Sequence, residues 1–237
     1  MWDNASLLRG IANALIALSV LAVLYGVINY AVHLPGLFPL HNVRLSATPQ
    51  RVDATGVLQV VRNEVQGNFF TVDIERLRQA LEKLPWVRSV SIRREFPYRL
   101  VVQLEEHQAL ARWNNHSLVN QQGEVFVARS EQALPNFIGP DGTAAEMTQH
   151  YTEFNQQLAA LNLQAGQIAL SPRHAWQLRL SNGMVLELGR EDLQQRLARF
   201  VAVQRTEEGR QKTEEASYVD LRYRNGFAVR QVTNVKG

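Results

Sequence analysis

The feature that most constrains this chain is an uncharged apolar segment near the N-terminus. No Asp, Glu, Lys or Arg occurs between Arg9 and Arg44, and residues 11–32 form the apolar part of that segment. As an α-helix those residues would span about 33 Å, enough to cross a hydrocarbon core of about 30 Å. A buried core helix would normally keep a polar stripe, and a signal peptide would have a shorter apolar region. The sequence therefore predicts one uncleaved transmembrane helix, with Tyr30 near the membrane–water interface.

Composition and motifs exclude several kinds of chemistry. The 25 Lys+Arg and 22 Asp+Glu residues are too evenly balanced for a dedicated nucleic-acid binder. Without Cys there is no disulfide, thiolate metal site or Cys nucleophile. No HExxH spacing, P-loop, G-x-S-x-G or G-x-G-x-x-G motif occurs. We therefore expect no catalytic residues, no metal site and no cofactor. His107, which follows two glutamates, is predicted to be a solvated strand end.

After a connector at residues 33–40, the first module is predicted at residues 41–113. Its pattern is strand–helix–helix–strand–strand, with Asp53 and Asp73 placed to cap the two helices. Residues 98–106 alternate apolar and polar side chains, as a half-buried strand does. Two amphipathic helices on one face of a three-stranded sheet would bury both apolar stripes. The predicted fold class of this module is α+β.

Residues 114–232 are predicted to be a second, mostly antiparallel β domain with helices. Strands are expected at 118–119, 125–127, 136–138, 176–180, 184–188, 218–223 and 227–232, and helices within 147–161 and 193–201. Asn-Gly pairs mark two hairpin turns, the second of them at Asn225-Gly226. Residues 207–215 contain no core-forming residue and are predicted to be a solvated loop. Residues 1–10 and 233–237 are left as tails.

Four segments, in this order and spacing, resemble the bacterial cell division protein family FtsQ, whose Gram-positive counterpart is DivIB. They are GNFFTVDIERLRQALEKLPWVRSVSIRREFPYRLVVQLEEHQALARW (67–113), LVNQQGEVF (118–126), LPNFIGP (134–140) and YVDLRYRNGFAVR (218–230). The resemblance implies a cytoplasmic tail, one transmembrane helix, a periplasmic POTRA domain at 41–113 and a second β domain. The orientation rests on the resemblance, because Arg9 lies on one side of the anchor and Arg44 and Arg51 on the other.

The resemblance also implies a function. Members of this family are non-enzymatic, single-pass type II proteins of the inner membrane that are recruited to the division septum. The implied partners are FtsB and FtsL, as a heterotrimer, together with FtsK, FtsW and FtsI. Such a protein links early cytoplasmic division proteins to septal peptidoglycan synthesis and binds no nucleic acid.

The family places the FtsB contact at the C-terminal hairpin. By position in the motif it falls on Arg222, Tyr223, Asn225, Gly226 and Phe227. A strand at a sheet edge offers unpaired N–H and C=O groups to which a partner strand can add. Tyr223 would be an amphipathic anchor, Arg222 a partner for a carboxylate, and Gly226 a turn residue with positive φ. The alternative is that Tyr223 and Arg222 only pack the sheet.

A second docking surface for other division proteins is predicted on the first module. It comprises Val90, Ile92, Arg93 and Arg94. The nearby arginines, which include Arg88 and Arg99, could equally form a solvated basic edge or a patch for lipid headgroups.

Two other functions stay open at this point. A POTRA-bearing component of an outer-membrane assembly or secretion system would need many alternating membrane strands or tandem POTRA units. A membrane-tethered periplasmic enzyme would need a catalytic constellation. The sequence shows neither feature, which favours the division scaffold.

Overall fold

The computed structural model describes residues 5–34, 36–40, 42–213, 216–224 and 226–231. It begins with α1 (Ala5–His33), which contains the predicted helix at 11–32 and extends beyond it at both ends. The part Leu8–His33 is long and apolar enough to cross a membrane, and its most apolar 18-residue stretch is not buried within the protein. The expected apolar helix is therefore confirmed.

The chain divides into two compact units, one ending at Glu106 and the other beginning at His107. The expected boundary after residue 113 is wrong, because β4 (Ala109–Trp113) pairs with strands of the second unit. Residues 109–113 had been included in the first module because the family-like segment 67–113 continues through them. Backbone pairing, which the sequence does not display, assigns it to the second.

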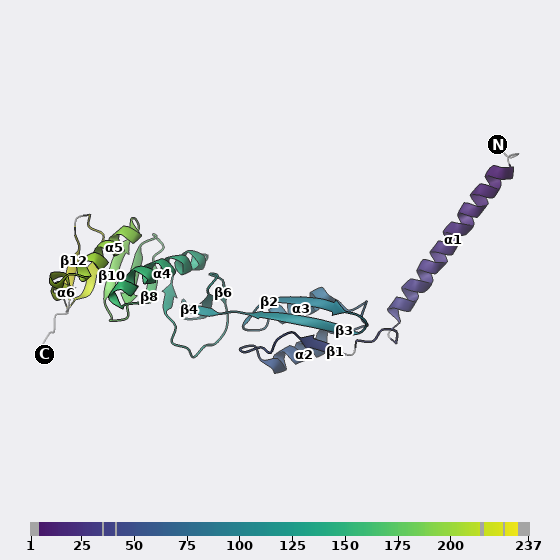
Figure 1. Ribbon diagram of the computed structural model, residues 1–237, viewed down its shortest axis with the longest axis horizontal. Coiled ribbons are helices and arrows are strands. Elements are labelled where there is room, and N and C mark those ends of the chain that lie inside the picture. Colours follow the sequence, from purple (N-terminus) through teal and green to yellow (C-terminus); the bar gives the residue numbers. More distant parts are fainter. Residues whose placement is uncertain (1–4, 35, 41, 214–215, 225, 232–237) are drawn as a thin grey trace. The chain divides into compact units, whose positions relative to one another are not determined.

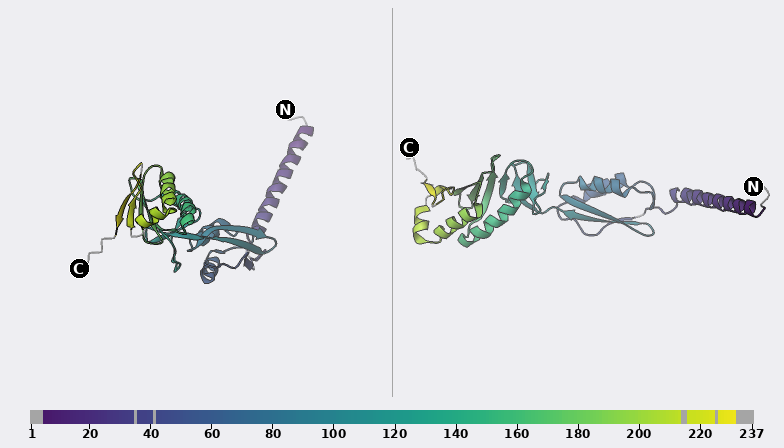
Figure 2. Two further views of the ribbon diagram at one scale, coloured as in Figure 1. Left: turned by 60° about the vertical axis from the view of Figure 1, so that its left-hand side comes forward. Right: turned by 90° about the horizontal axis from the view of Figure 1, so that it is seen from above.

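The first unit has the predicted α+β arrangement (Figure 1). Its elements are β1 (Asn42–Leu45), α2 (Ala54–Glu64), α3 (Ile74–Glu82), β2 (Val87–Glu95) and β3 (Arg99–Glu106). The strand order is β1-β3-β2, with β1 parallel and β2 antiparallel to β3. The two helices lie on the same side of the sheet (Figure 2), where Leu77, Leu81 and Leu100 are completely buried. On the outer face of α2, Leu58 is 53% exposed.

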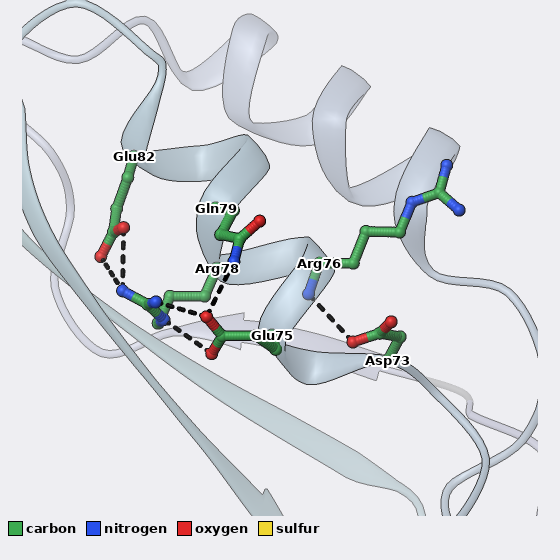
Figure 3. Close-up of polar contacts among 6 residues, drawn as sticks. All are labelled: Asp73, Glu75, Arg76, Arg78, Gln79 and Glu82. Atoms are coloured by element: carbon green, nitrogen blue, oxygen red, sulfur yellow. Dashed lines mark hydrogen bonds and ion pairs between the residues drawn. The ribbon is translucent and has the colours of Figure 1, made fainter.

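A capping residue and two ion pairs accompany α3 (Figure 3). The Asp73 carboxylate accepts a 2.9 Å hydrogen bond from the backbone N–H of Arg76, as predicted for a capping residue. Arg78 pairs with Glu75 and Glu82 on the helix surface, and its hydrogen bonds hold the pKa of Glu75 at about 2. Because these pairs are solvent-exposed, we attribute helix formation mainly to the cap and the buried leucines.

The second unit is built on one mixed sheet with helices against it. Within the described residues the strand order is β12-β11-β10-β9-β8-β7-β4-β5-β6. The further elements are β5 (Ser117–Asn120), β6 (Val125–Phe126), β7 (Asn136–Ile138), α4 (Ala144–Leu158), η1 (Ala159–Leu161), β8 (Ala165–Leu170), β9 (Trp176–Leu180), β10 (Val185–Gly189), α5 (Leu193–Gln204), α6 (Glu207–Thr213), β11 (Ala216–Asp220) and β12 (Ala228–Gln231). Helices α4 and α5 lie side by side and cover the core strands β8 and β10 (Figure 2). Most strand pairs are antiparallel, as predicted.

Two expectations for this unit are wrong. His107 is not a solvated strand end: its ring is 9% exposed, stacks on Phe126 at 4.0 Å and contacts Asn120 at 3.0 Å. Residues 207–213 form α6 rather than a loop. The helix packs without apolar side chains, because Gly209 lets its backbone approach the carbonyl of Val203 closely. Glu214 and Glu215 lie outside the described residues.

Candidate functional site in the C-terminal hairpin

The predicted C-terminal hairpin is formed by β11 and β12. The two strands are antiparallel, with Val219 opposite Val229 and Asp220 opposite Ala228. On its other side β11 runs parallel to β10, so the hairpin is joined to the main sheet. Within the part of the chain that is described, β12 is the last strand of the sheet. Its outer edge therefore presents backbone groups to which a further strand can add.

The connection between the strands is longer than predicted. A short turn at Asn225-Gly226 was expected, but β11 ends at Asp220 and β12 begins only at Ala228. Asn225 lies outside the described residues. Because the φ angle of Gly226 is defined with the carbonyl carbon of Asn225, the positive φ expected at Gly226 stays a prediction. A Cβ atom built on Gly226 would have nothing within 4 Å. Close approach within this chain therefore does not explain the glycine.

Arg222 pairs with a carboxylate of its own hairpin. The buried Asp220 side chain accepts hydrogen bonds from Arg222 Nε at 2.9 Å and Nη2 at 2.6 Å, and from the Arg222 backbone N–H at 3.0 Å. Hydrogen bonding to Arg222 holds the pKa of Asp220 below its usual value and raises the pKa of Arg222. The guanidinium is thus fixed in place, although 56% of the Arg222 side chain remains exposed.

Tyr223 and Phe227 have opposite environments. Tyr223 is 57% exposed, so most of its surface is not packed against the sheet. Its backbone is held by Arg199 on α5, whose guanidinium donates to the carbonyl oxygens of Tyr223, at 3.4 Å, and Arg224. Phe227 is partly buried and makes an edge-on contact with Phe200, with 6.1 Å between ring centroids. Of the predicted binding residues, Tyr223 is therefore exposed, whereas Phe227 is packed against the core of the second unit.

Two hollows flank the hairpin loop. One, of about 320 Å³, lies between α5 and the loop, with an apolar floor that includes Val203, Leu221 and Phe227. The other, of about 250 Å³, is basic and is lined by Arg190, Arg196 and Arg222, with Glu191.

Gly189 makes the basic hollow possible. A Cβ atom there would lie 2.8 Å from Arg196 Nη1 and 3.0 Å from Arg222 Cγ, and the residue has φ +78°. Arg196 and Arg199 were not among the residues predicted for this site. Their spacing of three residues on a predicted helix was the available signal, because such residues share one face.

The second predicted surface needs correction. Val90 is 6% exposed, so its side chain is not available to a partner, and Ile92 is half-buried against the core of the first unit. The Arg94 guanidinium is bound to the carbonyl oxygens of Phe69 and Val72, each at 3.0 Å. Arg93 is exposed. The error arises because alternate residues of a strand point to opposite faces, so one strand segment cannot present Val90 and Arg93 together.

Comparison with known proteins gives matches over both units. The domain described as "Cell division protein FtsQ/DivIB, C-terminal" matches residues 111–222, and the "POTRA domain, FtsQ-type" matches residues 38–107. "Cell division protein FtsQ" of Nitrosospira multiformis is 43% identical over 235 residues, covering 97% of this chain and 99% of the relative. Proteins of the same name from Burkholderia pseudomallei and Neisseria gonorrhoeae are 39% and 34% identical, each again over 97% of this chain and over 94% and 95% of the relative.

Proposed function

Because the chain belongs to the FtsQ/DivIB family of cell division proteins, we propose that it is a non-enzymatic, membrane-anchored scaffold that binds FtsB through its C-terminal hairpin. The observation that carries the proposal is the edge strand β12 beside an exposed Tyr223 and a hollow lined by three arginines. These features suit protein binding. Among the described residues no group of three or more His, Asp or Glu is placed to hold a metal ion.

The proposed membrane span rests on α1, and the proposed orientation rests on membership of the family. We propose that this helix crosses the inner membrane once, with the N-terminal tail in the cytoplasm and both units in the periplasm. The length and apolarity of Leu8–His33 support a single span. At the septum, contacts with FtsB and FtsL, and with other division proteins such as FtsK, FtsW and FtsI, would couple early cytoplasmic division proteins to peptidoglycan synthesis.

The hairpin offers three kinds of contact to an extended FtsB segment. Backbone hydrogen bonds to β12 would supply affinity, and alternate side chains of the added strand would supply specificity. An acidic side chain fits the basic hollow, where Asp220 keeps the Arg222 guanidinium oriented. An apolar side chain fits the hollow beneath the loop, next to Phe227.

The test is capture of the FtsB periplasmic segment by the full-length chain with Tyr223→Ala. We expect binding to weaken by at least tenfold, because an aromatic anchor typically contributes about 2 kcal/mol or more to an interface. Tyr98→Ala is the matched control, since this tyrosine is also exposed but lies in the first unit. Wild-type binding by a well-folded Tyr223→Ala variant would refute this interface.

For the second surface, we propose that a partner contacts the β2 edge through backbone groups and Arg93. Within the described sheet of the first unit, β2 is an outer strand. Arg93→Glu should then weaken recruitment of another division protein without affecting FtsB capture. Unchanged recruitment would remove this surface from the proposal.

A further inference from the structure

Exposed aromatic side chains gather at one end of the first unit. We call this group the aromatic tip; it comprises the aromatic residues Phe38, Phe70 and Phe96, which are 41%, 43% and 70% exposed, and the aliphatic Leu37, which is 43% exposed. They come from the connector after α1, the α2–α3 loop and the β2–β3 turn. The register places the connector and the β2–β3 turn together, since Asn42, at the start of β1, and Glu95, at the end of β2, are both paired with Arg99. The α2–α3 loop joins them through the antiparallel bridge between Pro39 and Asn68.

The rings of the tip contact one another through a buried phenylalanine. Phe38 meets Phe70 edge-on with 5.1 Å between centroids, and Phe70 meets Phe69 in the same geometry and at the same distance. Phe69, which is 5% exposed, also contacts Phe96 at 6.0 Å. A continuous row of rings therefore runs from the connector to the β2–β3 turn, and three of its four members face outward.

The tip is tied to the end of the apolar helix. The buried Asn68 donates from Nδ2 to the carbonyl oxygens of Val32, at 2.6 Å, and Leu34, at 3.3 Å. These carbonyl oxygens lie at the C-terminal end of α1, where the last carbonyl groups of a helix have no backbone N–H partner within it. The backbone N–H of Phe69 donates to the carbonyl oxygen of Phe38 at 3.0 Å. These three hydrogen bonds hold the aromatic rings a few residues beyond the apolar span.

A residue of the sheet, Arg94 on β2, also stabilises the α2–α3 loop of the tip. Arg94 donates to the carbonyl oxygens of Phe69, Phe70 and Val72, at distances of 3.0, 3.4 and 3.0 Å. An arginine used in this way fixes the loop that carries two of the rings. The exposed ring of Phe70 is therefore presented by an ordered loop, so little conformational freedom of this loop would be lost on binding.

We propose that the aromatic tip inserts into the membrane–water interface of the leaflet from which α1 emerges. The inference rests on the proposed membrane-spanning role of α1. Aromatic side chains are favoured at the headgroup level, and exposed apolar groups bind there in proportion to the apolar area they bury. The bilayer is the occupant we choose because the tip is continuous, in chain and in hydrogen bonding, with the C-terminal end of the span. The first unit would then be docked on the membrane.

The chain contains no Cys, so single cysteines can report local depth in the full-length protein. Phe96→Cys, Lys83→Cys and Leu21→Cys would each be labelled with an environment-sensitive fluorophore in phosphatidylcholine nanodiscs containing doxyl-labelled lipids. Lys83 is the matched control: it is exposed and precedes β2, at the opposite end of the sheet from the β2–β3 turn. Leu21 lies within α1 and reports insertion of the helix.

We expect lipid quenching at position 96 to be at least twofold greater than at position 83, with strong quenching at position 21. Equal, weak quenching at 96 and 83, with strong quenching at 21, would overturn the inference and leave the anchor intact. Shielding of position 96 from aqueous iodide without lipid quenching would indicate a protein contact and also overturn it. Absence of quenching at 21 would refute the membrane span, and the inference with it. Circular dichroism checks folding, and Phe70→Cys gives a second position in the tip.

Discussion

The carboxylate of Glu106 accepts a 2.8 Å hydrogen bond from the backbone N–H of Val52, joining the end of β3 to the segment before α2. The N–H groups of Arg51 and Gln50 donate to the same carboxylate, at 2.9 and 3.0 Å. Burial alone would raise the pKa of Glu106, but these three hydrogen bonds outweigh it and hold the pKa below its usual value. A single side chain thus fixes the β1–α2 loop.

Glu106→Gln should destabilise the first unit by about 1–3 kcal/mol, because a neutral amide accepts backbone hydrogen bonds less strongly and offers one oxygen instead of two. Urea unfolding of the full chain in detergent, followed by tryptophan fluorescence, measures the loss. Trp86 reports on this region, since the Arg51 guanidinium lies 4.6 Å from its ring centroid. Glu105→Gln is the control: Glu105 is 55% exposed and pairs with Arg88, so we expect less than about 1 kcal/mol.

The contribution of Glu106 should depend on pH. Because its folded pKa lies below the ordinary value of 4.5, the stabilisation is present above about pH 4.5 and is lost as the pH falls through the folded pKa. The difference between wild type and Glu106→Gln should therefore shrink on acidification. A difference that stayed constant from pH 7 to pH 3 would contradict the assigned role.

Arg94→Ala should destabilise the first unit by about 1.5–3 kcal/mol, because it leaves three carbonyl oxygens without a charged donor. Arg93→Ala, the neighbouring exposed position, should change stability by less than about 0.5 kcal/mol. Thermal unfolding of the two variants gives the comparison. Equal stability of both would mean that Arg94 does not hold the loop.

Gly123→Ala should be more destabilising than Gly183→Ala. Both glycines have positive φ, +79° and +89°, so each substitution costs about 1–2 kcal/mol in backbone strain. At position 123 the new Cβ would also lie 2.4 Å from the Cα of Ala145 on α4, whereas at 183 it would meet nothing within 4 Å. The clash should add about 1–3 kcal/mol. The denaturant midpoint of Gly183→Ala measures the cost of backbone strain, and the further decrease for Gly123→Ala measures the clash. Identical midpoints would contradict the close packing of Gly123 against Ala145.

Asp220→Asn should cost about 1–3 kcal/mol, since it leaves Arg222 beside a buried neutral side chain. The lowered pKa of Asp220 means that its contribution is present above its ordinary pKa of 3.8 and is lost as the pH falls below it. Glu207→Gln, which breaks an exposed pair with Arg210, should cost less than about 1 kcal/mol. If both substitutions had the same small effect at pH 7, the Asp220–Arg222 pair would not stabilise the hairpin.

Leu18→Arg should impair membrane insertion, because an arginine in the middle of the span costs about 2.5–3.5 kcal/mol. We expect a fluorescent fusion to lose its position at midcell. Leu18→Ile keeps the apolar surface and should localise normally. Midcell fluorescence of the arginine variant at the wild-type level would count against α1 as the anchor.

Side-chain pattern predicted much of the local structure but little of the packing. Asp53 and Asp73 were expected to cap α2 and α3, and they do so because capping needs only the first turn of the helix. The helix α6 was missed, since Gly209 packs by backbone approach and leaves no apolar signal. His107 was also misread: its neighbours in sequence are charged, whereas its neighbours in space are Phe126 and Asn120.

The sequence by itself determined the apolar helix, the two α+β units and the position of the hairpin in the chain. Those properties follow from periodicity, capping and the transfer of apolar residues out of water, all of which act over a few consecutive residues. Only the tertiary structure decided that Asp220 pairs with Arg222, and that Gly189 leaves room for the arginines of the basic hollow. It also decided that four phenylalanines contact one another next to Asn68. Such groups come from separate loops and strands, and backbone pairing and close packing bring them together.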